Sequence, residues 1–341
     1  MMRKNALILF TSIFFVFGCK KNNDVLGEDT GSLPDNYVSA IYVDNSAIKY
    51  FATGKGLAGF DGEKWTVYSD NLNLGISKIN DFGFENSDSG SELWLATNQG
   101  LKSVKVPVDE ASEITTYTKN TSSLAGDSVS VIKVDVNNYC WLGTDQGLSV
   151  LKDKIWPEID PKNYYDDQFF ITNRITSFGY NNDTVYIGTK GGGVARMVSG
   201  PVDAVTGASP FEIPWSFLAS NNVLAVYTDG NTQWFGTDEG VTKHVGTRAK
   251  QNWQSYFKED GLVDNNVQCI VKDLGGNMWF GTKGGVSVFD GFEWDSFTKS
   301  DGLVANNVLC IAVDIDGSLW FGTDAGVSHF KNNRWENYSA K

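Results

Sequence analysis

The stretch "LWFGTDAGVSHF", residues 319–330, decides the fold because its central letters recur along the chain. Aligned on the threonine, seven copies stand in order: "YFATGKGL" at Thr53, "WLATNQGL" at Thr97, "WLGTDQGL" at Thr144, "YIGTKGGG" at Thr189, "WFGTDEGV" at Thr237, "WFGTKGGV" at Thr282 and "WFGTDAGV" at Thr323. Successive threonines lie 44, 47, 45, 48, 45 and 41 residues apart. A unit repeated at this period is typical of a solenoid or a propeller. A reaction centre is needed only once, so a motif present seven times has a structural role in each repeat.

One unit contains four short strands. Residues 265–297 read as the apolar "NNVQCIVKD", the turn "LGGN", then "MWFGT", "VSVFDG" and "FEWDSF". Short strands separated by Gly, Asn and Asp turns predict antiparallel β structure, and seven such units predict an all-β, seven-bladed β-propeller of four-stranded antiparallel blades. We expect one domain over residues 36–339, with blades at about 36–70, 71–119, 120–160, 161–216, 217–258, 259–299 and 300–339.

The periodic residues have structural explanations. The large aromatic of the second strand is expected to fill the space between blades, and the glycine after it permits close approach. The threonine hydroxyl can satisfy a turn amide, and the glycine three residues later suits a positive φ. Five aspartates close the first strands and can bond the turn that follows, namely Asp44, Asp135, Asp229, Asp273 and Asp314.

The repeat resembles the two-component regulator propeller repeat, a sensor module of bacterial hybrid two-component systems. Its signature "NNVxxIxxDxxGxxWFGTxxGV" is complete at residues 306–327 and weakest in blades 2 and 4. The resemblance implies a propeller outside the cytoplasm that senses a ligand or a glycan. In that family a β-sandwich, a membrane helix and a kinase follow. Here the chain ends at Lys341, directly after the seventh unit, so kinase signalling is not expected.

The N-terminus predicts export and lipidation. Arg3 and Lys4 precede an apolar run of 12 residues, 6–17, which is too short to span a bilayer as a helix. It ends in "VFGC", which resembles a lipobox and implies a signal peptide over residues 1–18, acylation of Cys19 and a flexible tether over residues 19–35. Lys20 favours the outer membrane of a Gram-negative bacterium. The alternative is an ordinary signal peptide that contains a cysteine.

Composition excludes several classes of protein. Hydrophobic residues at 41% and aromatics at 13% are sufficient for a core, which excludes disorder. A net charge of −13 opposes binding to nucleic acid or to anionic lipid, because both need clustered Lys and Arg. Three further cysteines, Cys140, Cys269 and Cys310, cannot all pair internally, and we expect them to be small buried residues.

A polar ring is the candidate ligand-binding site. The loops before the first strands and those after the second strands are expected on one face, around the mouth of the channel. The first set contributes Tyr37, Arg174, Asn222, Asn266 and Asn307, and the second contributes Lys190, Asp238, Lys283 and Asp324. Such a mixture of amides and charges suits a hydroxyl-rich ligand; the alternative is that these are ordinary solvated turn residues.

The loop between the third and fourth units breaks the repeat on the same face. Residues 156–174 are longer than the equivalent loops and include Tyr164 and Tyr165, which are the leading candidate contacts together with Arg174. Aromatic rings stack on sugars, whereas the alternative is a loop folded down as a plug of the channel.

The sequence contains little evidence of a catalytic site. The two histidines, His244 and His329, fall on third strands of different units, and the sequence has no HExxH, GxSxG or paired CxxC motif. We therefore expect no catalytic residue, no metal and no cofactor. The sequence favours a lipid-anchored, extracytoplasmic binding module for a glycan or a partner protein; the alternative is a polysaccharide lyase or glycosidase that uses carboxylates at the mouth.

Replacing Cys19 with Ala tests the anchor. We expect Cys19→Ala to move the protein from the membrane fraction to the soluble fraction, because an acylated cysteine supplies stable anchoring. Fractionation followed by immunoblotting measures the change. Persistent membrane association of the variant would contradict the prediction.

Overall fold

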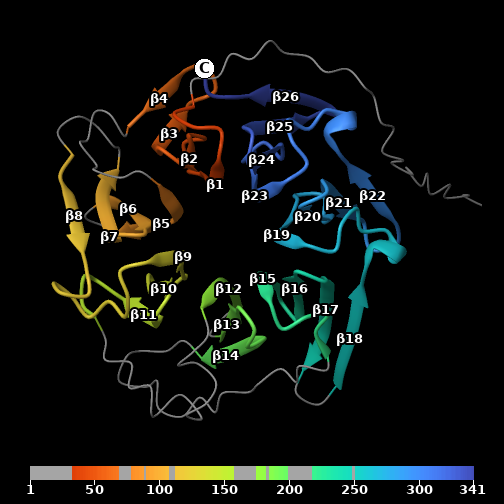
Figure 1. Ribbon diagram of the computed structural model, residues 1–341, viewed down its shortest axis with the longest axis horizontal. Helices are drawn as coiled ribbons and strands as arrows, with labels where there is room; N and C mark the ends of the chain where they lie inside the picture. The colour runs from red at the N-terminus through yellow and green to blue at the C-terminus, as the bar shows by residue number, and fades with distance from the viewer. Residues whose placement is uncertain are drawn as a thin grey trace, which may run out of the picture.

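Seven antiparallel sheets stand in a ring around a central channel, so the protein is a seven-bladed β-propeller with almost no helix (Figure 1). The computed structural model describes residues 33–68, 78–87, 90–106, 112–156, 174–181, 184–198, 217–247 and 250–341. Within each sheet, neighbouring strands follow one another along the chain, with the first strand innermost. The predicted fold class is confirmed.

The strands of each blade have the following bounds. Blade 1 has β1 (Val38–Val43), β2 (Lys49–Thr53), β3 (Gly56–Phe60) and β4 (Trp65–Val67), and blade 2 has β5 (Ile79–Ser87), β6 (Gly90–Thr97), β7 (Gly100–Val106) and β8 (Ile114–Tyr117). The described parts of blades 3 and 4 have β9 (Val129–Val134), β10 (Cys140–Thr144) and β11 (Gly147–Leu151), then β12 (Ile175–Asn181), β13 (Thr184–Thr189) and β14 (Val194–Val198). Blade 5 has β15 (Val223–Asp229), β16 (Thr232–Thr237), β17 (Gly240–Thr247) and β18 (Lys250–Tyr256). Blade 6 has β19 (Val267–Lys272), β20 (Met278–Thr282), β21 (Val286–Phe289) and β22 (Trp294–Phe297), and blade 7 has β23 (Val308–Val313), β24 (Leu319–Thr323), β25 (Val327–Lys331) and β26 (Arg334–Tyr338). Two single 3-10 turns, η3 (Lys258–Asp260) and η4 (Lys299–Asp301), follow blades 5 and 6.

The hydrophobic core is divided among the junctions between blades. Seven clusters of buried residues fall one to each junction, and the second-strand aromatics lie in them. Trp279 of blade 6, for example, packs against Phe321 of blade 7, with ring centroids 5.7 Å apart. The predicted role of the aromatics is therefore confirmed. Burial of a large side chain contributes about 1.5–3 kcal/mol, so each junction is stabilised mainly by these rings.

In four blades the indole N–H of the buried tryptophan donates to a carboxylate at the end of the first strand. The pairs are Trp94 with Glu85 at 2.9 Å, Trp141 with Asp135 at 3.0 Å, Trp279 with Asp273 at 2.8 Å and Trp320 with Asp314 at 2.9 Å. The aspartate also accepts a turn amide; Asn277 N, for instance, donates to Asp273 Oδ1 at 2.8 Å. One carboxylate thus holds the turn in its conformation and the indole ring in its position. The expectation that Asp229 would bond its turn is not met, because its carboxylate pairs with Lys272 instead.

The "GTxxG" segment forms the turn between second and third strands. Thr282 Oγ1 donates to Gly285 O at 2.8 Å and accepts from Gly284 N at 3.1 Å. Gly285 has φ of 139°, a conformation that only glycine adopts readily. The same threonine-to-glycine bond recurs in the other blades, at Thr53, Thr97, Thr144, Thr189, Thr237 and Thr323.

Each first strand carries a bulge after its first residue, and the bulged side chain reaches the next blade. Ser39 Oγ donates to Ile79 O at 2.6 Å, Asn80 Nδ2 to Val129 O at 2.7 Å, Ser130 Oγ to Ile175 O at 2.9 Å, Thr176 Oγ1 to Val223 O and Gln268 Nε2 to Val308 O at 2.9 Å. These bonds, which we call the inner clasps, link five of the seven junctions in the described part of the chain. Blades 5 and 7 have Leu224 and Leu309 at the bulge, which cannot donate.

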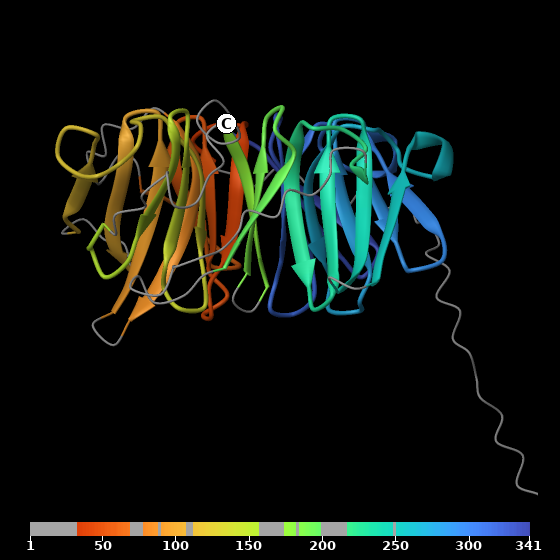
Figure 2. The same cartoon turned by 90° about the horizontal axis from the view of Figure 1, so that it is seen from below.

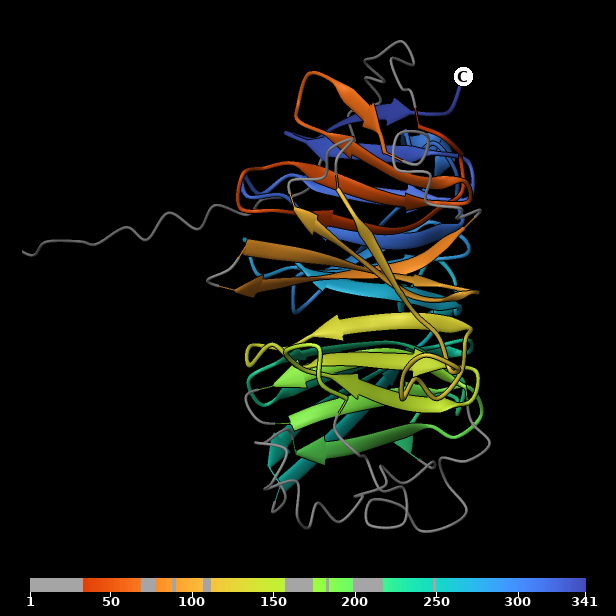
Figure 3. The ribbon, with the colours of Figure 1, turned by 90° about the vertical axis from the view of Figure 1, so that its left-hand side faces the viewer.

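Blade 7 packs directly on blade 1, and no strand is exchanged between them (Figure 3). Trp320 packs against Phe51 and Phe60 with ring centroids 5.8 Å from each, and Lys49 Nζ reaches Asp314 Oδ2 across the junction at 3.5 Å. Ala340 N donates to Asn36 Oδ1 at 2.6 Å, which joins the two ends of the ring. The ring therefore closes by packing of blade 7 on blade 1.

Removing one of the indole-bound carboxylates should destabilise its junction. We expect Asp273→Ala to lower the free energy of unfolding by about 1–3 kcal/mol, because the buried indole N–H and a turn amide lose their acceptor. The matched control is Asp229→Ala, which removes a half-exposed ion pair and should change the value by less than about 1 kcal/mol. Urea unfolding measures both; equal losses would contradict the structural role of the indole bond.

Candidate functional site

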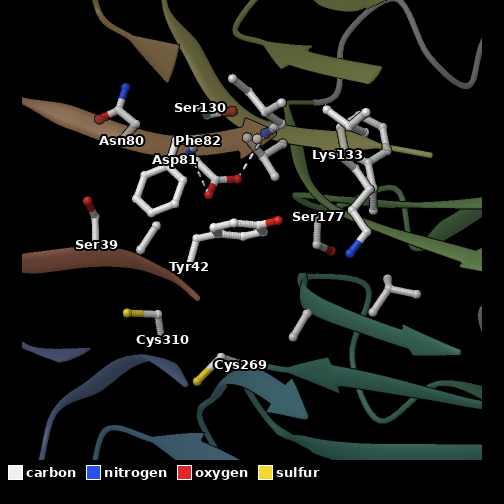
Figure 4. A pocket seen from close by; sticks show the side chains of 18 of the residues that line it. Ser39, Tyr42, Asn80, Asp81, Phe82, Ser130, Lys133, Ser177, Cys269 and Cys310 are labelled. Atoms are coloured by element: carbon white, nitrogen blue, oxygen red, sulfur yellow. Dashed lines mark hydrogen bonds between the residues drawn. The ribbon is translucent and has the colours of Figure 1, made fainter. Parts of the chain in front are cut away.

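The central channel contains a large cavity. Its volume is about 740 Å³, and its walls are the first strands of the blades. Figure 4 shows polar and apolar side chains from several blades directed into it. Most of its hydroxyl and amide groups are those of the inner clasps, including Ser39, Asn80 and Ser130. These groups are therefore occupied by the fold, which leaves few of them to a ligand.

Asp81 is a carboxylate of the channel wall that sequence reasoning missed. The equivalent position holds Ala40, Val131, Ser177, Ala225, Cys269 and Cys310 in the other blades. Asp81 Oδ1 accepts Phe82 N and its Oδ2 accepts Ile132 N of the next blade, both at 2.9 Å (Figure 4). Burial raises the pKa of this carboxyl to about 6, although the two amides and nearby Lys133 oppose the shift. The available signal was a charged residue at a position that is otherwise small or apolar.

The two cysteines of the channel wall, Cys269 and Cys310, are free thiols and only partly buried, whereas Cys140 is buried as expected. Burial raises the pKa of Cys269 to about 12 and that of Cys310 well above its usual value, so neither is a reactive thiolate. A Cβ at Gly281 would lie 2.3 Å from Cys269 Sγ, and one at Gly322 would lie 2.4 Å from Cys310 Sγ. The glycine of the motif therefore makes room for the first-strand side chain.

The mouth residues lie at the turns that the sequence predicted, but several are bonded to one another. Asn222 Nδ2 donates to Asp238 Oδ2 at 2.8 Å, and Asn307 Nδ2 donates to Asp324 Oδ2 at 2.9 Å. These pairs come from blades 5 and 7, where a first-strand loop meets the turn after the second strand. Tyr37 instead carries Lys78 Nζ over its ring, 4.7 Å from the centroid.

Two acceptor atoms at the mouth have no hydrogen-bond partner among the described residues. They are Asp238 Oδ1 in blade 5 and Asn266 Oδ1 in blade 6, both buried. Arg174, Lys190 and Lys283 are exposed on the same set of turns, and main-chain bonds hold these turns together: Lys190 N donates to Arg174 O at 2.9 Å and Lys283 N to Asn266 O at 3.2 Å. The mouth thus offers unpaired acceptors beside exposed cations.

Three of the predicted site residues lie outside the described residues. They are Cys19 and the loop residues Tyr164 and Tyr165. Their roles stay predictions.

The histidines lie on third strands, as predicted, and each stacks on a tryptophan at 4.1 Å: His244 on Trp253 in β17 and β18, and His329 on Trp320 in β25 and β24. Burial lowers the pKa of both imidazoles. No three His, Cys, Asp or Glu side chains in the described parts of the chain are grouped so that they could hold a metal ion.

Asp81 should make stability depend on pH between about 4 and 6. Its pKa is about 6 in the folded protein and near 3.8 in the unfolded chain, so the folded state binds the proton more tightly. Its contribution is therefore fully present below about pH 4 and is lost as the pH rises through 6. We expect Asp81→Asn to remove a slope worth about 1–3 kcal/mol over this window, measured by urea unfolding at several pH values. The exposed-site variant Asp145→Asn controls for loss of one charge; an unchanged slope in Asp81→Asn would contradict the assignment.

Comparison with solved structures shows the same fold in proteins of different roles. PorZ, an essential bacterial surface component of the type-IX secretion system of Porphyromonas gingivalis, is 19% identical with a TM-score of 0.70 over 89% of this chain and 47% of that one. Virginiamycin B lyase from Staphylococcus aureus, solved as an inactive variant with quinupristin, is 12% identical with a TM-score of 0.63 over 88% of this chain and 96% of that one. The extracellular domain of BT3049 from B. thetaiotaomicron, assigned to a hybrid two component system, is 19% identical with a TM-score of 0.43 over 89% of this chain and 51% of that one. The chain therefore spans about half the length of the PorZ chain and of the BT3049 extracellular domain.

At these identities the likeness shows the fold alone. A comparison with curated proteins finds no match. The family model of the two component regulator propeller matches residues 302–325, which include most of the signature noted in the seventh unit. The resemblance inferred from the sequence is thus confirmed, and the chain carries the two component regulator propeller repeat.

Proposed function

We propose that this propeller is an extracytoplasmic, lipid-anchored binding module that recognises a glycan or a partner protein at the mouth of its channel. The observation that carries the proposal is the pair of unpaired acceptors, Asp238 Oδ1 and Asn266 Oδ1, on adjacent blades. A buried acceptor without a donor is costly, and a ligand hydroxyl or amide can satisfy it.

The surroundings of these acceptors suit a polar ligand. Lys190 and Lys283 are exposed on the turns of blades 4 and 6, on either side of Asp238 in blade 5. Asn222 holds the other oxygen of Asp238, so the free oxygen is fixed in direction. A fixed acceptor flanked by donors discriminates between hydroxyl groups by geometry, as polar ligand sites commonly do.

The extracytoplasmic location rests on the N-terminal sequence, with Cys19 as the proposed point of lipid attachment and the outer membrane as the proposed location. None of the helical segments in the described part of the chain has the length and apolar character needed to cross a bilayer. PorZ is a surface component of a secretion system, and this analogy supports the partner-protein form of the proposal.

One observation favours an enzyme as a second candidate. Asp81 is a channel carboxylate outside the repeat pattern, and its raised pKa is a property of general acids. Both of its oxygens, however, accept main-chain amides. A glycosidase also needs a second carboxylate across the scissile bond, so the binding module remains the better-supported candidate.

Substitutions at the mouth test the binding proposal. Against a panel of polysaccharides and glycans, we expect the double variant Asp238→Ala, Asn266→Ala to lose at least about tenfold in affinity for whichever member binds the wild type. Binding is measured by glycan array and then by calorimetry. The matched control is Asp145→Ala, the equivalent aspartate of blade 3, which is exposed and should bind as the wild type does.

A second variant and a second readout separate the remaining alternatives. Tyr164→Ala, Tyr165→Ala should keep its fold and lose most affinity if these rings contact the ligand; unfolding would identify them as a plug of the channel. The same incubations are assayed for new reducing ends and unsaturated products. Cleavage that disappears in Asp81→Asn would establish the enzyme, and unchanged binding by the Asp238, Asn266 variant would place the ligand elsewhere.

A further inference from the structure

Blade 5 breaks the pairing of indole and carboxylate that the other tryptophan-containing second strands keep. Trp234 is only 2% exposed, yet its Nε1 bonds no carboxylate of its own blade; this atom is not among the enclosed polar atoms that lack a partner, so it faces open space. In blades 2, 3, 6 and 7 the equivalent N–H donates to Glu85, Asp135, Asp273 and Asp314, respectively. A buried indole donor normally finds an acceptor, so the acceptor of Trp234 is missing from its own blade.

The cause is a turn that is one residue shorter. Asp135, Asp273 and Asp314 each stand six residues before their tryptophan, whereas Asp229 stands five residues before Trp234. The shorter turn pairs Asp229 with Thr232 in the strand ladder, with only Gly230 and Asn231 between them. Asp229 keeps the ladder position of Asp273, two residues beyond the partner of the tryptophan, but no amide of the shorter turn donates to its carboxylate. Asp229 is half-exposed and bonds Lys272 of blade 6.

A cavity of about 170 Å³ lies where the carboxylate would be. It is formed by blades 5 and 6, and Trp234, Phe289 and Met278 are among its apolar walls. Its rim includes residues of the turns after first and third strands, such as Gly276 and Gly291. These turns emerge on the face opposite the channel mouth, and Figure 2 shows the two faces of the ring from the side. The volume suits one side-chain-sized group.

Two carboxylates also line this cavity, but both are engaged: Asp229 pairs with Lys272, and Asp290 accepts the amides of Phe292 and Glu293 in its turn. Lys243 Nζ lies 5.1 Å from the centroid of Trp234 and 5.9 Å from that of Phe289, and no carboxylate of the described residues forms an ion pair with it. Lys272 lines the cavity with its ammonium shared with Asp229. An indole N–H beside the unpaired ammonium of Lys243 is a site for an anion, and a carboxylate is what the equivalent position holds in the other tryptophan-containing blades.

A matched junction shows how the same space is filled from within. Between blades 7 and 1, Lys49 Nζ lies over the rings of Phe60 and Trp320, and it meets Asp314, which also binds the Trp320 indole. At the junction of blades 5 and 6 a lysine again lies over the indole, but it is Lys243 from the tryptophan's own blade, and the carboxylate is displaced. This junction also lacks an inner clasp, since Leu224 occupies the bulge.

We propose that the cavity between blades 5 and 6 binds a carboxylate supplied from outside, as the acidic side chain of a polypeptide partner. An exposed aromatic ring next to the cavity favours a polypeptide: Phe292, which follows the lining residue Gly291, is 91% exposed. An acidic residue with an apolar neighbour would cover this ring while its carboxylate accepts from Trp234 Nε1 and Lys243 Nζ. This site is separate from the channel mouth and does not depend on the function proposed there.

Indole NMR of the full protein labelled with ¹⁵N-tryptophan tests the site. The probe is glutamate capped as its N-acetyl and α-methylamide derivative, titrated at constant ionic strength, with capped glutamine as the neutral control. We expect the Trp234 N–H resonance, assigned with Trp234→Phe, to shift saturably with capped glutamate alone. The resonance of Trp279, whose N–H is already bonded to Asp273, is the internal control. Equal movement of both resonances, or an equal response to capped glutamine, would overturn the proposal.

Two variants and one further ligand sharpen the result. Lys243→Met should weaken binding roughly tenfold, since it removes a charged donor, whereas Lys331→Met on the same face should bind normally. Inserting one glycine after Gly230 restores the six-residue spacing and should let Asp229 occupy the site, which abolishes the response to the probe. Tighter binding of glucuronate than of capped glutamate would overturn the assignment to a polypeptide.

Discussion

The rest of the structure depends on one interaction, the bond between a buried indole N–H and the carboxylate at the end of the first strand. An aromatic ring must fill the space between two blades, and its polar edge must find an acceptor there. Because the acceptor is also the residue that orders the first turn, the shape of the turn and the packing of the junction are set together. A blade that keeps the ring and shortens the turn therefore leaves a donor exposed to a cavity, as blade 5 does.

The fold could be predicted from the sequence because the motif recurs in all seven units and each of its positions has its own structural role. The aromatic, glycine and threonine positions have the structural roles that the sequence predicts. The inner clasps could not be predicted, because the bulge that directs them leaves no fixed residue type: Ser39, Asn80, Thr176 and Gln268 all serve. A bulge displaces one residue from the ladder, and a sequence pattern of strands does not register that displacement.

The candidate site was predicted only in outline. Counting strands placed Asn222, Asp238 and Asn266 on one face, since loops of equal phase emerge together. Sequence could not show that Asn222 binds one oxygen of Asp238 while the other oxygen is left unpaired, because that division depends on side-chain geometry within a few tenths of an ångström. Asp81 was hidden for a different reason. It lies in blade 2, one of the units that match the repeat signature least well. There, a residue that departs from the signature cannot be told from ordinary variation between units.

The closure of the ring has a consequence for the ancestry of such proteins. Since blades 7 and 1 meet without sharing a strand, every blade is a complete segment of chain, and the junction that contains the two ends is built like its neighbours. Asn36 and Ala340 are already in hydrogen-bond contact, so joining them and cutting the chain between two other blades would preserve every sheet. A circular permutation of the blades is therefore compatible with the fold. Duplication or loss of a gene segment can add or remove one whole blade without leaving a half-finished sheet behind.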